Sequence, residues 1–455
     1  MVKNESLCLM EKNMNNLERY EVVKAGGWSL ANADRVRSVM DYIKGNPGMR
    51  YFVPSAPGAI NNGDIKVTDR LIACCRLREE GQSFEDDFNA VRTQFSAIAQ
   101  DLGYYGIDKQ LDLVEEGIIK GSNYDWVISR GEAVNGRLWA DLLDFRFIDP
   151  TELIRFRKDG QLDERSYAQI ARGLRGRDRF VIPGFYGLGA TGEVHTFPRD
   201  GSDVTGSVVA RGVNASIYRN LTNIDGVYSA DPGIVGKKTA RLIEELTYRE
   251  YRELGSAGFK VLHKDTIVPV ASVGIPINVR HSELPGSRGT LVVGSRVNPL
   301  GQEVIGIAGR GGFVSLDIHK WGMDDDRGIG RRILQVIEKN GISITHPLTE
   351  NDSMSIIFSE DQLNTGKEEK IMEALKRQIK PTEVNLRRNI GILSLVGQGI
   401  SGNGSMVTAK LEEVLNGHGI SYGITRLPRS ISIRVFLESN RLADAICVSH
   451  EALVG

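Results

Sequence analysis

Phe197-Pro-Arg-Asp-Gly-Ser-Asp-Val-Thr-Gly-Ser207 is the stretch from which we interpret the rest of the chain. It places a cation, a hydroxyl and a carboxylate (Arg199, Ser202 and Asp203) just before a small apolar run, Val208–Ala210, which predicts a helix. The start of a helix carries free N–H groups and partial positive charge, so it attracts anions. Arg199 offers a planar fork for a carboxylate or phosphate, and Asp203 suits a metal ion or an ammonium group. The same residues also fit an ordinary capped turn, with Ser202 or Asp203 as the N-cap.

A second anion-binding candidate lies upstream, in Glu21-Val-Val-Lys-Ala-Gly-Gly-Trp-Ser29. The pattern predicts a short strand, a Gly26-Gly27 turn and then a helix. Glycines let backbone amides approach an anion closely, and Lys24 at the end of the strand would neutralise it. The turn is not a Walker loop, because G-x-x-x-x-G-K-[ST] does not occur in the chain. On its own, a Lys-x-Gly-Gly turn is more often structural than catalytic.

Composition limits the classes of protein to consider. A chain of 455 residues is too long for one core and predicts two or three domains. The net charge of −1 gives no indication of a nucleic-acid or membrane partner. Residues 1–18 lack the apolar core of a signal peptide, and the seven histidines, of which His263 lies nearest the candidate chemistry, show no metal-ligand spacing. The cysteines show no C-x-x-C spacing, which favours free thiols and a cytoplasmic protein; they are Cys8, Cys74, Cys75 and Cys447.

From Val22 to about Val293, short apolar strands alternate with helical stretches, which predicts a mostly parallel sheet covered on both faces. In such sheets ligands bind beyond the carboxyl ends of the strands. We therefore expect Ser55 and Glu132, which follow two of these strands, to lie near a ligand. The predicted strands are Val22–Val23, Arg50–Val53, Asp125–Ser129, Phe180–Pro183, Ala215–Tyr218 and Pro276–Val279.

The polar loop Leu221–Gly233 follows one of these strands and contains one aromatic residue, Tyr228. Tyr228 suits stacking on a base, and Thr222 and Asp225 suit hydrogen bonds to ribose or phosphate. The alternative is a β-hairpin around Asp225-Gly226, a strong turn dipeptide. Farther on, Lys260 lies near the end of a helical stretch, from which it would reach the phosphates or simply extend into solvent.

The last third of the chain contains an internal duplication. Val336-Ile-Glu-Lys-Asn-Gly-Ile-Ser-Ile344 recurs as Val414-Leu-Asn-Gly-His-Gly-Ile-Ser-Tyr422, and Ser353–Ile357 recurs as Ser430–Arg434. The nearly equal spacing of the two echoes predicts two copies of a small strand–helix–strand unit. The pattern also predicts an amphipathic helix over 328–339 and a charged helix over 366–377.

Together these motifs resemble the aspartokinases of the amino-acid kinase family. Lys24–Ser29 resembles the family's K-F-G-G-[ST]-S turn, and Arg199–Asp203 its R-G-G-S-D. Thr222–Pro232 is similar to T-D-V-D-G-V-Y-x-x-D-P, and Gly258–His263 to G-x-K-V-L-H. Pro183–Gly187 is similar to the P-G-F-Y-G of a bacterial branch. The similarity extends from about Arg19 to the C-terminus.

The resemblance implies a fold, a reaction and partners. The fold would be a three-layer αβα domain with a mostly parallel sheet over 19–298, after an N-terminal extension over 1–18. Two ferredoxin-like α+β ACT domains would follow, over 299–380 and 381–455. The reaction would convert ATP and L-aspartate to ADP and 4-phospho-L-aspartate, at the entry to lysine, threonine and methionine biosynthesis. Mg²⁺ would be held by the ATP phosphates rather than by a dedicated protein site. An amino-acid effector and a homodimer formed through the ACT domains are also implied.

The resemblance also implies a role for individual residues. Lys24, Lys260 and Asp203 would be catalytic, with Asp203 orienting its neighbours. Substrate would be bound by Arg199 at the α-carboxylate, by Glu132 at the α-ammonium, and by pocket residues, which are Ser55, Thr68 and Ser202. The nucleotide would contact Lys24, Gly26, Gly27, Thr222, Asn223, Asp225, Tyr228, Asp231, Pro232, Lys260 and Val261.

Several positions depart from the family pattern. Ala25 and Trp28 replace a phenylalanine and a small hydroxyl residue, Asp200 replaces a glycine, and Asn223 and Gly233 replace an aspartate and an arginine. Two alternatives therefore stay open. One is a paralogous kinase that phosphorylates a different amino-acid carboxylate, and the other is a catalytically weak, amino-acid-sensing subunit. Arg426-Leu-Pro-Arg-Ser430 also departs from the family's Q-G-S-S-E, which leaves the effector open.

Overall fold

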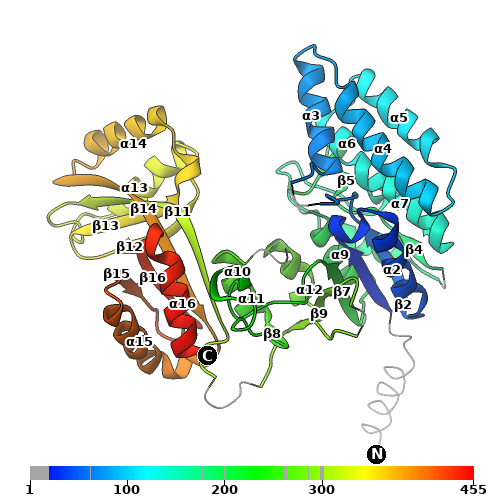
Figure 1. The fold of residues 1–455 in the computed structure, drawn as a ribbon. Helices are drawn as coiled ribbons and strands as arrows, with labels where there is room; N and C mark the ends of the chain where they lie inside the picture. Colours follow the sequence, from blue (N-terminus) through cyan, green and yellow to red (C-terminus); the bar gives the residue numbers. More distant parts are fainter. Residues whose placement is uncertain are drawn as a thin grey trace, which may run out of the picture. The chain divides into compact units, whose positions relative to one another are not determined.

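The computed structural model describes residues 20–454, apart from 62, 177, 199–200, 260–261, 263, 285 and 298–301. Contacts divide the described residues into two compact units (Figure 1). The first unit lies within Met1–Val227, Leu242–Arg252 and Lys260–Arg296. The second lies within Tyr228–Arg241, Glu253–Phe259 and Val297–Gly455. The domain boundaries expected at 298/299 and 380/381 remain predictions.

The first unit is built on an eight-stranded sheet, with the order β3-β4-β2-β1-β7-β9-β10-β8. All neighbouring strands are parallel except β9 and β10. The strands are β1 (Glu21–Ala25), β2 (Met49–Pro54), β3 (Arg146–Phe147), β4 (Phe180–Val181), β7 (Ile217–Thr222), β8 (Glu245–Thr247), β9 (Ile277–His281) and β10 (Thr290–Val293). A separate hairpin joins β5 (Tyr186–Leu188) to β6 (Val194–Thr196).

Helices cover both faces of this sheet. Every residue of β2 is buried, and alternate side chains of a strand point to opposite faces, so neither face is open to water there. Helix α7 (Arg130–Leu143) packs on β2, β3 and β4, and α9 (Gly201–Gly212) packs on β1, β2 and β7. The other helices are α2 (Ala33–Lys44), α3 (Val67–Glu79), α4 (Glu85–Asp101), α5 (Ile107–Ile119), α6 (Tyr124–Ile128), α8 (Arg165–Gly173) and α12 (Ile267–Ala271), with α11 (Tyr248–Ser256) divided between the units. The predicted αβα fold with a mostly parallel sheet is confirmed.

One predicted strand was wrong. Asp125–Ser129 forms helix α6 instead, and α7 follows it directly. Asn123 explains the difference, because its side chain accepts a hydrogen bond from Trp126 N and caps the helix. The predicted strand over 180–183 is shorter than expected, since β4 ends at Val181.

The second unit contains one six-stranded sheet, with the order β12-β13-β11-β14-β16-β15. The strands are β11 (Gly306–His319), β12 (Ile344–Thr349), β13 (Ser353–Ser359), β14 (Glu383–Val396), β15 (Tyr422–Thr425) and β16 (Ser432–Glu438). The order strand, helix, strand, strand, helix occurs twice along the chain, which confirms the predicted duplication. The predicted helices are present as α13 (Ile329–Lys339) and α14 (Thr365–Gln378), and the second copy supplies α15 (Ile400–Gly417) and α16 (Leu442–Leu453). The two copies share the sheet, because β11 and β14 pair antiparallel at its centre.

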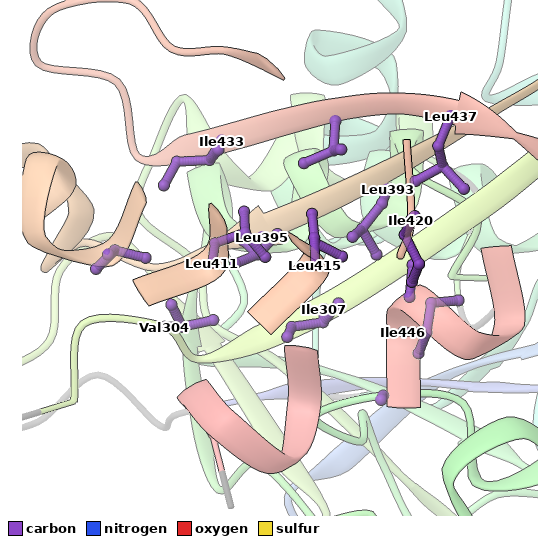
Figure 2. Close-up of a cluster of buried hydrophobic side chains, with 14 of the residues drawn as sticks. Val304, Ile307, Leu393, Leu395, Leu411, Leu415, Ile420, Ile433, Leu437 and Ile446 are labelled. Carbon is purple, nitrogen blue, oxygen red and sulfur yellow. The ribbon is translucent and has the colours of Figure 1, made fainter. Parts of the chain in front are cut away.

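Each copy has its own apolar core. In the second copy, Leu411 and Leu415 of α15 meet Leu393 and Leu395 of β14 (Figure 2). Ile446 of α16 belongs to the same cluster. Across the described residues, no helix has both the length and the apolar composition needed to cross a membrane.

We expect Leu411→Ala to lower the free energy of unfolding of the second unit by about 2–5 kcal/mol, because Leu411 is fully buried. Met406→Ala is the matched control on the same helix, since Met406 is 58% exposed and should change the free energy by less than about 0.5 kcal/mol. Denaturant unfolding of both variants measures the difference. Equal effects would contradict the packing described for α15.

Candidate active site

A cavity of about 670 Å³ lies in the first unit, where β1 and β2 end. Its lining contains eight of the residues predicted from sequence, which are Lys24, Gly27, Ser55, Thr68, Glu132, Ser202, Asp203 and Asn223. They come from segments that are far apart in sequence, and the fold brings them together beyond the carboxyl ends of parallel strands. The predicted position of the ligand site therefore agrees with the cavity.

The centre of the cavity wall is a buried ion pair. Lys24 Nζ of β1 lies 2.5 Å from Asp203 Oδ1 of α9, and each side chain is only 9% exposed. Asn220 of β7 donates a second hydrogen bond to Asp203 Oδ1, at 2.8 Å. Three elements therefore fix the Lys24 ammonium at the edge of the cavity, where it can stabilise an anionic ligand.

Tyr218 contacts the backbone of Asp203, one member of this ion pair. Its hydroxyl donates to the backbone carbonyl of Asp203 at 3.0 Å. A Cβ atom at position 206 would lie 2.6 Å from the Tyr218 ring and hydroxyl, so only Gly206 lets the ring approach α9 this closely. Burial raises the pKa of Tyr218 well above its usual value, which keeps the hydroxyl protonated as a donor.

Glu132 places a carboxyl group in the same cavity. It lies in the first turn of α7 and is 5% exposed. Burial raises its pKa to about 8, while backbone N–H groups of Ala56 and Glu132, followed by Arg130 and Lys24, lower it by less. Among the described residues, Glu132 Oε2 has no hydrogen-bond partner. A buried acceptor of this kind is costly unless a ligand donates to it, so Glu132 suits an ammonium group.

The glycine turn packs against the loop that follows β2. Gly58 N donates to Gly27 O at 2.8 Å, and Gly26 N donates to Leu221 O at 2.9 Å. A Cβ atom on Gly58 would lie 2.6 Å from the Gly27 carbonyl carbon. Both backbones therefore meet without side chains between them, and Gly27 reaches the cavity.

Trp28 forms the next part of the wall. The Arg35 guanidinium lies 3.9 Å from the centre of the indole, and the His281 ring meets it edge-on at 5.5 Å. Arg35 Nη1 also donates to the Trp28 backbone carbonyl at 3.4 Å. The indole is thus held from two sides while it lines the cavity.

Ser55 and Thr68 are two further polar residues of the cavity wall. Hydrogen bonds fix the backbone of Ser55. Ser55 N donates to Ala25 O at 3.1 Å, and Asn135 donates to Ser55 O at 2.6 Å. Thr68 lies in the first turn of α3, beside Lys66, which also lines the cavity.

Phe185 lines the cavity in a left-handed backbone conformation, with φ at 82°. Few residues other than glycine adopt this conformation, and such strain often occurs at functional sites. Gly184 beside it is also required, because a Cβ atom there would lie 2.6 Å from the Ser202 side chain.

Other predicted residues have different outcomes. Arg199, Asp200, Lys260, Val261 and His263 lie outside the described residues. Tyr228, Asp231 and Pro232 belong to the second unit, so their predicted contact with nucleotide stays a prediction.

Two alternatives from the sequence are not observed. Asp225-Gly226 is not the turn of a hairpin, because β7 pairs in parallel with β1 and β9. Ser202 and Asp203 are not N-caps, because α9 already begins at Gly201 and places both in its first turn.

Sequence reasoning missed several residues that build the site. Asn220 had a detectable signal, since it is a polar residue beside Leu221 in a strand, and both positions are buried. Asn135 and Tyr218 had no local signal, because each contributes through a partner on another element. Arg35 lies near Trp28 in the sequence, but no pattern there indicates that its guanidinium covers the indole.

Comparison with known proteins shows which chains share this architecture. The profile of the amino acid kinase family matches residues 19–281. Aspartokinase 3 of Bacillus subtilis is 35% identical over 400 residues, which cover 84% of this chain and 87% of that protein. The crystal structure of Clostridium acetobutylicum aspartate kinase matches with a TM-score of 0.82 at 33% identity, covering 96% of this chain and all of that one. Escherichia coli aspartokinase III, solved with aspartate and ADP, shares the fold with a TM-score of 0.80 at 23% identity, over 96% of this chain and 100% of that chain.

We expect the site to bind L-aspartate more tightly as the pH rises from about 6 to about 8. An α-ammonium group would pair with ionised Glu132, and because the pKa of Glu132 is raised to about 8, the empty site would first have to lose a proton below that pH. The dissociation constant should fall by about tenfold per pH unit and level off above about 8. Titration calorimetry in buffers of different ionisation enthalpy would measure the released proton.

Glu132→Gln is the control for this titration. The variant should bind weakly and without the pH dependence, since its amide does not titrate. A wild-type affinity that is constant between about pH 6 and about pH 8 would show that Glu132 does not contact the ammonium group.

Proposed function

The chain belongs to the amino acid kinase family, within which it is an aspartokinase, and we propose that it transfers the γ-phosphoryl group of ATP to the β-carboxylate of L-aspartate. The product would be 4-phospho-L-aspartate. The observation that carries this proposal is the presence, in one cavity, of a buried fixed cation (Lys24) and an unsatisfied buried carboxyl group (Glu132). The first suits a phosphoryl group and the second suits the ammonium group of an amino acid.

The reaction needs no general base. A β-carboxylate has a pKa near 3.9, so at neutral pH it is already ionised and can attack phosphorus directly. One carboxylate oxygen forms a bond to the γ-phosphorus, and the bond from that phosphorus to the ADP oxygen breaks. The barrier comes from bringing two anions together, so catalysis consists of positioning and charge neutralisation.

The proposed substrate contacts follow from the cavity and from the family pattern. Glu132 would accept hydrogen bonds from the α-ammonium group, and Arg199 would bind the α-carboxylate through its planar fork. Pocket polar groups, which are Ser55, Thr68 and Ser202, would bind the remaining oxygens. Such an arrangement would direct the β-carboxylate towards Lys24.

Lys24 would stabilise the transferring phosphoryl group, and Asp203 would keep its ammonium group in place through the 2.5 Å ion pair. Lys260 would supply a second cation. The backbone of Gly26 and Gly27 would approach the phosphates, because no side chain stands between them. The remaining nucleotide contacts would come from Thr222, Asn223, Asp225, Tyr228, Asp231, Pro232 and Val261.

Mg²⁺ would enter with the nucleotide. Among the described residues, no group of three or more His, Cys, Asp or Glu side chains could hold a metal ion. Lys24 and the glycine turn instead suit the phosphates themselves, which bind Mg²⁺ strongly. The ion would supply charge neutralisation on those phosphates, while the protein positions the acceptor.

The duplicated units would bind an amino-acid effector and join two copies of the chain, as the ACT resemblance implies. Such control would fit an enzyme at the entry to lysine, threonine and methionine biosynthesis.

One observation favours a second candidate function. Trp28 fills part of the cavity wall where the family has a small hydroxyl residue, and Arg35 and His281 hold it there. A changed wall beside the phosphate-binding glycines suits a paralogous kinase with a different amino-acid carboxylate as acceptor.

We expect ATP with L-aspartate and hydroxylamine to yield a hydroxamate, because hydroxylamine traps acyl phosphates. A panel of amino-acid carboxylates tested in parallel identifies the acceptor, and Lys24→Gln, expected to lower kcat at least about 100-fold, is the negative control. Hydroxamate from another acid but not from aspartate would support the second candidate. ADP release with none of the acids would contradict both.

We expect Trp28→Ser to change kcat/KM for the acceptor by about tenfold or more, since it removes a fixed wall of the cavity. An increase for aspartate would show that the indole is costly for that substrate, and a decrease would show that it contributes to the pocket. Arg37→Ala on the neighbouring exposed face of α2 is a control that should leave kcat/KM unchanged. An unchanged kcat/KM in Trp28→Ser would mean that the indole does not contact the acceptor.

A further inference from the structure

Asp125 of α6 holds strand β6 through two contacts. Thr196 Oγ1 donates to Asp125 Oδ1 at 2.8 Å, and His195 Nδ1 lies 2.9 Å from Asp125 Oδ2. The two oxygens of the Asp125 carboxylate therefore contact two consecutive residues of β6. The Asp125 side chain is 25% exposed, and a partly exposed pair of this kind contributes little to stability.

Strand β6 leads directly into the wall of the active-site cavity. Thr196 and Phe197 line the cavity, and the same stretch continues to Ser202 and Asp203. Arg199, the proposed ligand of the α-carboxylate, lies three positions after Thr196 in the sequence. The position of β6 therefore affects Phe197, the next residue of the cavity wall.

A chain of hydrogen bonds continues from β6 to the first turn of α9. Phe197 N donates to Phe185 O at 2.8 Å, and Phe185 N donates to Thr205 Oγ1 at 2.9 Å. Thr205 Oγ1 in turn donates to Gly201 O at 3.1 Å. The chain ends in the helical turn that carries Ser202 and Asp203.

Side-chain packing connects the same elements. The Phe197 ring meets the Phe156 ring at 4.7 Å, and His195 meets Phe156 at the same distance. A Cβ atom at Gly201 would lie 2.4 Å from Phe197 Cβ, so the first turn of α9 rests directly on this residue. A shift of β6 would move Phe197 and with it the start of α9.

Helix α6 itself forms another part of the cavity wall. Tyr124 and Ile128 line the cavity on either side of Asp125 in the sequence. Asn123 caps the helix by accepting from Trp126 N, which fixes its N-terminal turn. Asp125 thus connects α6 and β6, two elements of the cavity wall. Of these, α6 is fixed by its Asn123 cap.

We propose that Asp125 is a positioning residue for the amino-acid substrate: through Thr196 and His195 it holds Phe197, and through Phe197 the first turn of α9 with Ser202, in place at the cavity wall. The inference rests on the proposed function, because it concerns the acceptor half of that site. It predicts a larger effect on acceptor binding than on nucleotide binding, since Ser202 lies in the first turn of α9 while Asn223 and the glycine turn lie outside the chain of contacts described above. Lys24, which pairs with Asp203, is a proposed nucleotide contact that is linked to the turn of α9.

The first test is a split between kinetic constants. Asp125→Ala should raise KM for aspartate by about tenfold or more, while KM for ATP changes by less than about twofold. Asp125→Asn should restore part of the loss, because its amide oxygen still accepts from Thr196. Thr196→Val should reproduce part of the effect, and its combination with Asp125→Ala should be less than additive, as expected for residues in contact.

Glu193→Ala is the matched control. It removes a neighbouring hydrogen bond between the residues that directly precede α6 and β6, in which Asn123 Nδ2 donates to Glu193 Oε2 at 3.1 Å. Glu193 is exposed and does not line the cavity, so both KM values should stay unchanged.

A second readout does not depend on activity. Amide hydrogen exchange at Phe185 and Phe197 should be faster in Asp125→Ala than in wild type, and unchanged in Glu193→Ala. The proposal is overturned if exchange is unaffected, or if Asp125→Ala lowers only the melting temperature or raises both KM values equally. If wild type phosphorylates another acid, the proposed substrate fails, and the same KM split is then measured with that acid. If wild type has no activity, the exchange result alone decides whether Asp125 holds Phe197 in place.

Discussion

The Lys24 ammonium and the Asp203 carboxylate form an ion pair from which water is largely excluded, and the arrangement of the site depends on it. Removing charges from water costs several kcal/mol per ion, so such a pair needs well-fixed partners. Here they come from separate elements: β1 supplies the lysine, α9 the aspartate, and β7 the amide of Asn220. This explains why the sheet order matters, since β1 lies beside β7 and under α9. A cation held in this way needs no reorganisation when charge builds up on a ligand.

The sequence predicted which residues line the site better than it predicted the contacts that hold those residues in place. Lys24, Ser55 and Asp203 were identified because each follows or opens an element at the same edge of a parallel sheet. Glu132 was identified from a strand predicted over 125–129, which is helix α6 in the structure. The duplicated unit was visible as two spaced echoes. Local patterns failed for Asp125–Ser129, where a side-chain cap and contacts with α3 and β6 override an apolar run that suits a strand equally well.

Long-range partners account for most of what could not be predicted. Asn135, which donates to the Ser55 carbonyl, and Tyr218, which donates to the Asp203 carbonyl, belong to other elements than the residues that they support, and no local pattern indicates these contacts. The interleaving of the two compact units was equally invisible. Short segments within the expected catalytic range, 228–241 and 253–259, cluster with the C-terminal sheet because of contacts made far along the chain.

Gly206 shows how far from the ligand the requirements of the site extend. Because Gly206 has no side chain, the Tyr218 hydroxyl can reach the Asp203 backbone carbonyl. This hydrogen bond helps to align the Asp203 carboxylate with Lys24. A single methyl group at 206 would therefore act on charge alignment in the cavity without touching any bound molecule. Variant libraries that randomise only the residues lining the cavity, in order to change acceptor preference, would therefore not sample position 206.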